Sequence, residues 1–253
     1  MHADAVFLDE IFVSLQGEGG EIGRPHVFLR LAGCPLRCTY CDTPRSWVRR
    51  PSFERHLGAA TTTGANPLGA DALQRELEAL CVHHGLAPRR TVLAVTGGEP
   101  LEQADFLAGW LPRWPGRVLL ETAGVMPERL ARLLPEVEIV SLDWKLPSML
   151  RAGADLCDPL GCVQVVAGAA RATEWWIKIV VAATTPDAEL AHALRATAGA
   201  APGARVFLQP ATPFGAGPNP PSAERLLAWV AEHEPLGLDL RVVPQMHPVL
   251  GAR

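Results

Sequence analysis

The stretch Cys34-Pro35-Leu36-Arg37-Cys38-Thr39-Tyr40-Cys41-Asp42-Thr43 holds three cysteines at C-x3-C-x2-C spacing. A tight loop with this spacing can direct three thiolates to one point, which suits three of the four irons of a cubane iron–sulfur cluster. A structural zinc site is closed by four ligands, whereas three ligands leave an open position for chemistry. Buried free thiols are the alternative, because cysteine is among the most buried residue types. The spacing therefore predicts a [4Fe-4S] cluster held by Cys34, Cys38 and Cys41.

The composition limits the classes of function. The chain of 253 residues is 48% hydrophobic and 20% charged, as is typical of a soluble globular protein. A net charge of −4 gives no basic field, so nucleic acid is not an expected partner. The first residues do not have the pattern of a signal peptide, and no run of about 18 apolar residues follows, so no membrane association is expected. We expect a cytoplasmic location, where the thiols that a cluster needs stay reduced.

Short apolar segments alternate with helical patterns through most of the chain. Strands are expected at residues 9–16, 27–31, 92–95, 118–121, 137–142, 176–181, 206–209 and 240–243. Helices are expected at residues 188–196 and 223–232, and after Asp71, which could cap a helix that buries Leu73, Leu77 and Leu80 and ends at Gly85. About six such units predict an α/β fold, a partial (β/α)6-type barrel with its site at the carboxyl ends of the strands. Residues 1–253 are expected to form a single domain, with residues 45–70 as an irregular, mobile insertion.

Polar residues recur where the apolar strands end. Thr96-Gly97-Gly98-Glu99-Pro100 follows one strand, and its glycines would allow a ligand to approach the backbone closely, although a plain glycine-rich turn is the alternative. Later strands end at Glu121, Ser141, Asp143, Lys145 and the Gln209-Pro210 pair, each of which could instead be a helix cap or a satisfied loop group. Lys178 points opposite to Ile177 and Ile179, so we expect a ligand or a carboxylate to meet it inside the barrel.

The cysteine loop resembles the cluster motif of radical S-adenosylmethionine (SAM) enzymes, in which SAM takes the open iron and is cleaved to a 5′-deoxyadenosyl radical. Within that superfamily the flanks resemble the QueE-type 7-carboxy-7-deazaguanine synthases. The matching segments are residues 10–19, which include the QGEG box at residues 16–19, the lead-in at residues 23–33, the cysteine loop with its exit Asp42-Thr43, the GGEP motif at residues 97–100, the Lys178 strand and Gln245-Met246-His247. Residues 45–70 and 148–174 are left unmatched.

This resemblance implies a lyase reaction. The family converts 6-carboxy-5,6,7,8-tetrahydropterin to 7-carboxy-7-deazaguanine by radical ring contraction with loss of ammonia, in queuosine and 7-deazapurine biosynthesis for tRNA modification. Mg²⁺ is implied to hold the substrate carboxylate, with Thr43 as its protein ligand, and one hydroxyl suits an ion that keeps much of its water. An external one-electron donor such as flavodoxin and a homodimer are the implied partners.

The resemblance also implies where the cofactor and the substrate bind. Contacts with SAM are implied for Tyr40, Cys41, Asp42, Gly97, Gly98, Glu99, Glu121, Ser141, Asp143, Lys145, Gln209 and Pro210, and no catalytic residue is expected beyond the cluster-bound SAM. Contacts with the substrate are expected at Leu15, Gln16, Gly17, Glu18, Arg30, Thr96, His247 and Arg253. The donor–acceptor edge of a pterin suits paired hydrogen bonds with Gln16, Glu18 and the backbone of Leu15 and Gly17, and the substrate carboxylate suits Arg30. The QGEG box could instead be a hairpin turn, and Arg30 could neutralise Asp42 or Glu18.

Two other functions remain open from the sequence. An activating enzyme that makes a glycyl radical on a protein shares the cysteine spacing but has no use for the QGEG box. A non-catalytic iron–sulfur or zinc protein would need a fourth protein ligand and would have no affinity for SAM. Cys81, Cys157 and Cys162 are scattered, so we expect them to be buried thiols rather than ligands of a second cluster.

Overall fold

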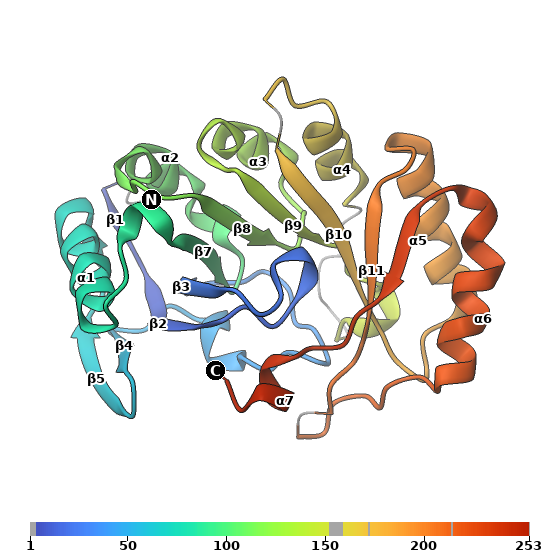
Figure 1. The fold of residues 1–253 in the computed structure, drawn as a ribbon, viewed down its shortest axis with the longest axis horizontal. Coiled ribbons are helices and arrows are strands. Elements are labelled where there is room, and N and C mark those ends of the chain that lie inside the picture. The colour runs from blue at the N-terminus through green and yellow to red at the C-terminus, as the bar shows by residue number, and fades with distance from the viewer. Residues whose placement is uncertain (1–3, 152–158, 172, 214, 253) are drawn as a thin grey trace.

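The computed structural model describes residues 4–151, 159–171, 173–213 and 215–252, and its main feature is a ten-stranded sheet (Figure 1). The strand order is β12-β11-β10-β9-β8-β7-β3-β2-β4-β5. In this sheet order, the neighbouring strands between β12 and β3 all pair in parallel. They are β3 (Pro25–Leu31), β7 (Val92–Gly97), β8 (Val118–Thr122), β9 (Ile139–Asp143), β10 (Glu174–Val181), β11 (Arg205–Pro210) and β12 (Asp239–Val242). Every strand expected from residue 92 onward is present in this sheet, so the parallel arrangement is confirmed.

Helices cover the outer side of the curved sheet. Figure 1 shows them as an outer arc around the strands, running from α1 to α6. They are α1 (Ala70–His83), α2 (Ala104–Trp110), α3 (Pro127–Leu133), α4 (Leu160–Ala167), α5 (Asp187–Ala200) and α6 (Ala223–His233). The sheet has two free edges, β12 and β5, so it is an open, partial barrel as predicted.

The first helix illustrates how local sequence decides an element. Leu73, Leu77 and Leu80 are fully buried against the sheet, as their spacing predicts. The expected cap is wrong, because the N-cap is Gly69 and helix α1 begins at Ala70. Asp71 lies in the first turn and pairs with Arg113 at 2.6 Å.

The segment at residues 45–70 is not irregular, which corrects the expectation from sequence. It forms a hairpin of β4 (Ser52–Leu57) and β5 (Ala60–Ala65), and β4 runs parallel to β2 (Leu8–Leu15) with Glu10 opposite Glu54. A short second sheet pairs β1 (Ala5–Val6) with β6 (Leu68–Gly69). The hairpin therefore extends the main sheet and brings its own side chains toward β2.

The concave side of the sheet is built in two layers. The inner layer is apolar and takes one residue from each of β2, β3, β7, β8, β9, β10 and β11. In that order these residues are Phe12, Phe28, Ala94, Leu119, Ile139, Trp176 and Phe207. Side chains on one face of a strand recur every second residue. Two residues further along the parallel strands stand Arg30, Thr96, Glu121, Ser141, Lys178 and Gln209. A polar layer therefore lies above an apolar floor at the carboxyl ends of the strands.

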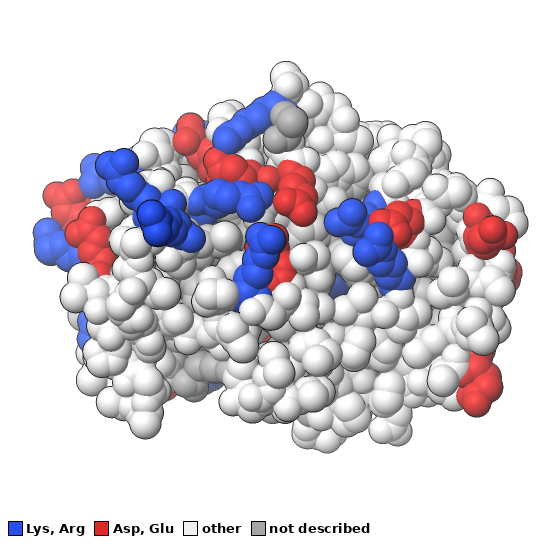
Figure 2. Space-filling model, in the orientation of Figure 1, with Lys and Arg blue, Asp and Glu red and all other residues white. Residues whose placement is uncertain are grey.

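The surface carries mixed charge. Figure 2 shows basic and acidic side chains lying beside one another over part of the face drawn, with large uncharged areas elsewhere. Surface ion pairs such as Arg225–Asp187, at 3.0 Å, join opposite charges. Within the described part of the chain, no helix combines the length and the apolar character that crossing a membrane requires.

Candidate active site

A cavity of about 610 Å³ opens above the polar layer. The expected residues that line it are Leu15, Gln16, Gly17, Glu18, Arg30, Cys34, Cys38, Tyr40, Cys41, Asp42, Thr43, Thr96, Gly97, Gly98, Glu121, Ser141, Asp143, Lys145, Gln209 and His247. Glu99 and Pro210 are not part of this wall, and Arg253 lies outside the described residues. The fold thus brings segments from both ends of the chain around one cavity.

The cysteine loop is held by hydrogen bonds within the loop and by hydrogen bonds to Met149. Arg37 donates to the carbonyl oxygens of Cys34 and Leu36, at 2.5 and 2.6 Å. The backbone N–H and the hydroxyl of Thr39 both donate to the carbonyl of Met149, at 2.9 and 3.1 Å. These bonds fix a loop that has no regular secondary structure of its own.

The three loop cysteines suit a cluster with three protein ligands. Cys34, Cys38 and Cys41 share one small apolar cluster with Leu36 and Ala123. Burial raises the pKa of the Cys34 thiol to about 12 and also raises that of Cys38, so thiolates here need a cationic partner such as iron. The other described cysteines, Cys81 and Cys162, are fully buried in the main core, as expected, and Cys157 lies outside the described residues. Among the described residues, no fourth cysteine joins the three in their cluster.

The GGEP motif binds the cysteine loop to the sheet. Gly97 has φ of +136°, and a Cβ on Gly98 would lie 2.1 Å from the carbonyl oxygen of Gly33, so both positions require glycine. The backbone N–H of Glu99 donates to that same oxygen at 2.8 Å. The Glu99 carboxylate accepts from Thr122 Oγ1 and from the backbone N–H of Ala123, both at 2.7 Å. In this structure the glutamate ties β7 to β8 rather than facing the cavity.

Glu18 is the centre of a charged network. Its carboxylate accepts hydrogen bonds from Lys178, from Gln209 at 3.1 Å and from Gln245. Although burial raises the pKa of Glu18, the Lys178 ammonium and these hydrogen bonds outweigh it and lower the pKa to about 2. Lys178 also lies 3.2 Å from Asp143, so the expectation that a carboxylate would meet this buried lysine is confirmed.

A second group joins Gln16, Thr96 and Glu121. The Glu121 carboxylate accepts from Gln16 Nε2 at 2.7 Å and from Thr96 Oγ1 at 2.9 Å. Burial, and then the charge of Glu18, raise the pKa of Glu121. This carboxylate therefore links residues expected at the substrate with a strand end expected at SAM.

The residues expected at SAM at the carboxyl end of β9 and just after it are also connected. Ser141 accepts from Trp176 Nε1 at 2.9 Å, and the Oδ2 oxygen of Asp143 accepts from Lys145. The Lys145 ammonium lies 5.1 Å from the centre of the Tyr40 ring. The other oxygen of Asp143, Oδ1, is buried without a hydrogen-bond partner in the structure. An orphaned acceptor on the cavity wall suits a ligand that donates a hydrogen bond.

Arg30 has a partner that sequence reasoning missed. Its Nε donates to Glu10 Oε1 at 2.8 Å, rather than to Asp42 or Glu18. Glu10, Asp9, Arg45 and Glu54 also line the cavity. No short motif marks them, because β4 brings Glu54 opposite Glu10 across 44 positions of sequence.

The C-terminal tail lies against the QGEG box. The backbone N–H of Met246 donates to the carbonyl of Gly17 at 2.9 Å, and α7 (His247–Leu250) follows. A Cβ on Gly17 would lie 2.7 Å from His247 Nδ1, so only glycine allows this approach. Gln245 and His247 thereby reach the cavity.

Known proteins resemble this chain along most of its length. Residues 15–123 match a family of 4Fe-4S single cluster domains. Proteins named 7-carboxy-7-deazaguanine synthase from Geobacter sulfurreducens and Methanothermobacter thermautotrophicus are 35% and 33% identical, with 96% of this chain and 96% of each relative aligned.

Solved structures support the fold. QueE from Escherichia coli superposes with a TM-score of 0.60 at 21% identity, covering 95% of this chain and 94% of that chain. Streptococcus suis SuiB bound to its precursor peptide SuiA gives 0.51 at 12% identity, over 83% of this chain and 46% of that chain. The partial barrel is thus shared with proteins of quite different sequence.

Proposed function

The chain belongs to the 7-carboxy-7-deazaguanine synthase family, and we propose that its cavity contracts 6-carboxy-5,6,7,8-tetrahydropterin to 7-carboxy-7-deazaguanine. It is a radical SAM enzyme with a 4Fe-4S cluster. The observation that carries the proposal is the full-length similarity, 33–35% over 96% of both chains, joined to one cavity that contains the cysteine loop and the polar layer.

The cysteine side of the cavity is proposed to hold the cofactors. Cys34, Cys38 and Cys41 would bind three irons, and SAM on the fourth supplies a 5′-deoxyadenosyl radical when it is reductively cleaved. The SAM contacts are proposed at Tyr40, Asp42, Gly97, Gly98, Glu121, Ser141, Asp143, Lys145 and Gln209. The buried, unpaired Oδ1 of Asp143 supports a hydrogen-bond donor on the ligand at this position.

The opposite side is proposed to read the pterin. An ionised carboxylate can accept about four hydrogen bonds, and Glu18 accepts three from Lys178, Gln209 and Gln245. Because Glu18 stays ionised, it suits an N–H of the pterin edge. Arg30 suits the substrate carboxylate, and its position beside the cavity, held through Nε by Glu10, supports that role.

Mg²⁺ at Thr43 is a further proposal. Thr43 lines the cavity beside Asp42, and its carbonyl accepts from the Ser46 hydroxyl at 2.8 Å. One threonine hydroxyl, with water and substrate oxygens, fits an ion that keeps several waters. Thr43→Ser is expected to retain Mg²⁺-dependent turnover and Thr43→Val to lose it, measured over a Mg²⁺ titration.

The electron donor, the homodimer and the cytoplasmic location are also proposals. An external donor of the flavodoxin type would reduce the cluster, in a cytoplasmic homodimer. The guanidinium carbons of Arg37 and Arg151 lie 5.1 and 5.4 Å from the Trp47 ring centre, close to the cysteine loop. Positive charge close to the cysteine loop supports an electron donor whose docking surface is acidic, because opposite charges attract across an interface.

Product formation tests the function directly. Anaerobically reconstituted protein is supplied with SAM, reductant, Mg²⁺ and 6-carboxy-5,6,7,8-tetrahydropterin, and 7-carboxy-7-deazaguanine is followed by mass spectrometry. Wild type should form product and Cys38→Ala should not. Cys81→Ala is the matched control, because Cys81 lies in the main core, and it should retain both iron and turnover. SAM cleavage without the deazapurine would contradict the proposed reaction.

A further inference from the structure

We propose that His56, on the β4–β5 hairpin, is a positioning residue that orients Arg30 toward the substrate carboxylate by holding Glu10 between them. The inference rests on the proposed role of Arg30. It assigns a function to the segment at residues 45–70, which the resemblance left unmatched.

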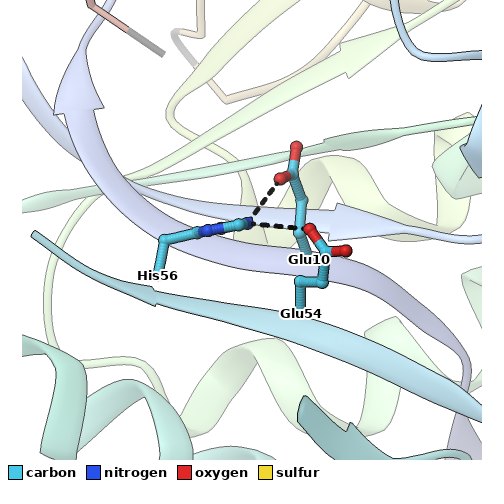
Figure 3. Close-up of side chains that lie close together, drawn as sticks. All are labelled: Glu10, Glu54 and His56. Carbon is cyan, nitrogen blue, oxygen red and sulfur yellow. Dashed lines mark hydrogen bonds and ion pairs between the residues drawn. The ribbon is translucent and has the colours of Figure 1, made fainter. Parts of the chain in front are cut away.

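The relay consists of hydrogen bonds at both ends of one carboxylate. His56 Nε2 lies 2.9 Å from Glu10 Oε2, and Arg30 Nε donates to Glu10 Oε1 at 2.8 Å (Figure 3 shows the His56 end). A carboxylate only accepts, so the hydrogen must sit on His56 Nε2. Since each oxygen has its own donor, the plane of the Glu10 carboxylate is fixed, and with it the direction from which Arg30 is held.

The histidine ring is itself fixed. Its Nδ1 lies 3.0 Å from the hydroxyl of Thr61, the residue opposite on β5. The ring stands edge-on to Phe12, with centres 6.3 Å apart, and the Arg30 guanidinium carbon lies 5.6 Å from the same Phe12 ring. His56 is 4% exposed and Glu10 8%, so water competes little with these bonds. Arg30 is thereby held by Glu10 on one side and by an aromatic face on another.

The neighbouring charges complete the cluster. Glu54 Oε2 lies 3.4 Å from His56 Nε2, and the other Glu54 oxygen accepts from Arg45. Arg45 also lies 3.4 Å from Asp9. Two arginines and a histidine thus face three carboxylates. Arg45 pairs with Glu54 and Asp9, so these two carboxylates do not compete with Glu10 for Arg30.

A cation site is the other interpretation of this geometry. Ligand atoms of Glu10, Glu54 and His56 all lie within 4.8 Å of one another. However, both carboxylates already accept from arginines, and the nitrogen of His56 that faces them carries a hydrogen. A metal would have to displace these donors and approach two guanidinium groups. The observations therefore favour the relay.

Strand alternation supplies a matched control. Along β4, Glu54 and His56 face Glu10, whereas Arg55 points to the other side, as successive strand residues do. Arg55 donates to both oxygens of Glu76 on α1, at 2.6 Å each. A change at Arg55 therefore loosens the hairpin without touching the relay.

The test measures carboxylate selectivity in the reconstituted holoenzyme with SAM. The dissociation constants of 6-carboxypterin and of pterin without the carboxylate are determined anaerobically, and their ratio is compared between variants. Wild type should prefer 6-carboxypterin. His56→Leu should reduce that preference on the order of tenfold, the size of coupling found between residues in contact. His56→Gln, which keeps a donor, should retain most of it, and Arg55→Leu all of it.

Two further variants separate a relay from a general loss of structure. Glu10→Gln keeps the shape but places an amide between two donors, so it should lose preference as His56→Leu does, even if the latter folds poorly. In an Arg30→Ala background, which should have no preference, His56→Leu should change nothing further.

Three results would overturn the relay: no carboxylate preference in wild type, a wild-type ratio in both His56→Leu and Glu10→Gln, or an equal loss in Arg55→Leu. Turnover is scored separately. If wild type binds 6-carboxypterin selectively but forms no 7-carboxy-7-deazaguanine, the proposed reaction fails and the relay stands.

Discussion

At the scale of single residues, the charge network of Glu18 makes a testable contribution to stability. Its pKa falls from 4.5 to about 2 in the folded protein, since Lys178 and the amides outweigh the effect of burial. A lowered folded-state pKa gives stability that is present above pH 4.5 and is lost as the pH falls through 2. The shift corresponds to about 3 kcal/mol, of which about 2 kcal/mol is lost between about pH 5 and pH 3.

Glu18→Gln removes this titration, and that is the first prediction. The free energy of unfolding of wild type, measured by urea denaturation of the cluster-free protein, should fall more steeply from pH 5 to pH 3 than that of Glu18→Gln, by about 2 kcal/mol. At pH 6 the variant should be less stable, because Lys178 loses one of its two carboxylate partners. Parallel pH profiles would show that Lys178 does not stabilise the ionised Glu18.

The residue scale also shows the limit of sequence reasoning. Much of the site could be found from the sequence. The QGEG box and the cysteines are short motifs, and the strand-end polar groups come directly after buried apolar strands. Glu10 and His56 could not, since they lie 46 positions apart and meet only through the pairing of β2 and β4. Likewise, nothing in the GGEP motif reveals that the Glu99 carboxylate accepts from residues at the end of β8.

At the scale of elements, apolar strands were predictable and the polar hairpin was not. Apart from the edge strand β12, the strands of the parallel sheet are mostly buried on both faces, so each reads as a short apolar run. In β4 only Phe53 and His56 are buried, and β5 is almost wholly exposed, so no apolar period marks this hairpin. Its role comes from pairing with β2, which local sequence does not encode.

The join between β7 and the cysteine loop gives the second prediction. Gly98→Ala would place a methyl group 2.1 Å from the Gly33 carbonyl oxygen and 2.7 Å from that of Ser46, so the loop must shift. Unfolding free energy should fall by about 1–3 kcal/mol, as in other overpacked sites, and iron incorporation should fall with it.

Gly109→Ala is the matched control for that change. Gly109 lies in helix α2, and a Cβ there would meet nothing within 4 Å. Alanine should raise helix stability by about 0.5–1 kcal/mol and leave iron content unchanged. Urea denaturation and iron analysis of both variants check the pair. Equal effects of the two substitutions would mean that the close approach at Gly98 does not determine the loop.

At the scale of the whole molecule, the described C-terminal tail lies against the QGEG box and contributes to the cavity wall. The described tail passes below the open side of the arc, with α7 in the lower part of the view in Figure 1. Gln245 donates to Glu18, Met246 donates to Gly17, and His247 lines the cavity. The last strand of the sheet, β12, ends at Val242, so the tail can be removed without cutting the sheet.

A chain that ends at Pro244 is the third prediction. It should fold and bind its cluster, because no strand of the sheet and none of the three cysteines is removed. The KM for 6-carboxy-5,6,7,8-tetrahydropterin should rise roughly ten- to hundredfold, as expected when two hydrogen bonds at the substrate side, one of them to a charged group, are lost. Cleavage of SAM in the absence of substrate should be retained, since the cysteine side is untouched. Val249→Ala is the control: Val249 is 73% exposed, so the tail should stay in place and KM should not change. If truncation left KM at the wild-type value, the tail would not contribute to substrate binding. If instead it abolished SAM cleavage as well, the tail would support the whole cavity rather than its substrate side.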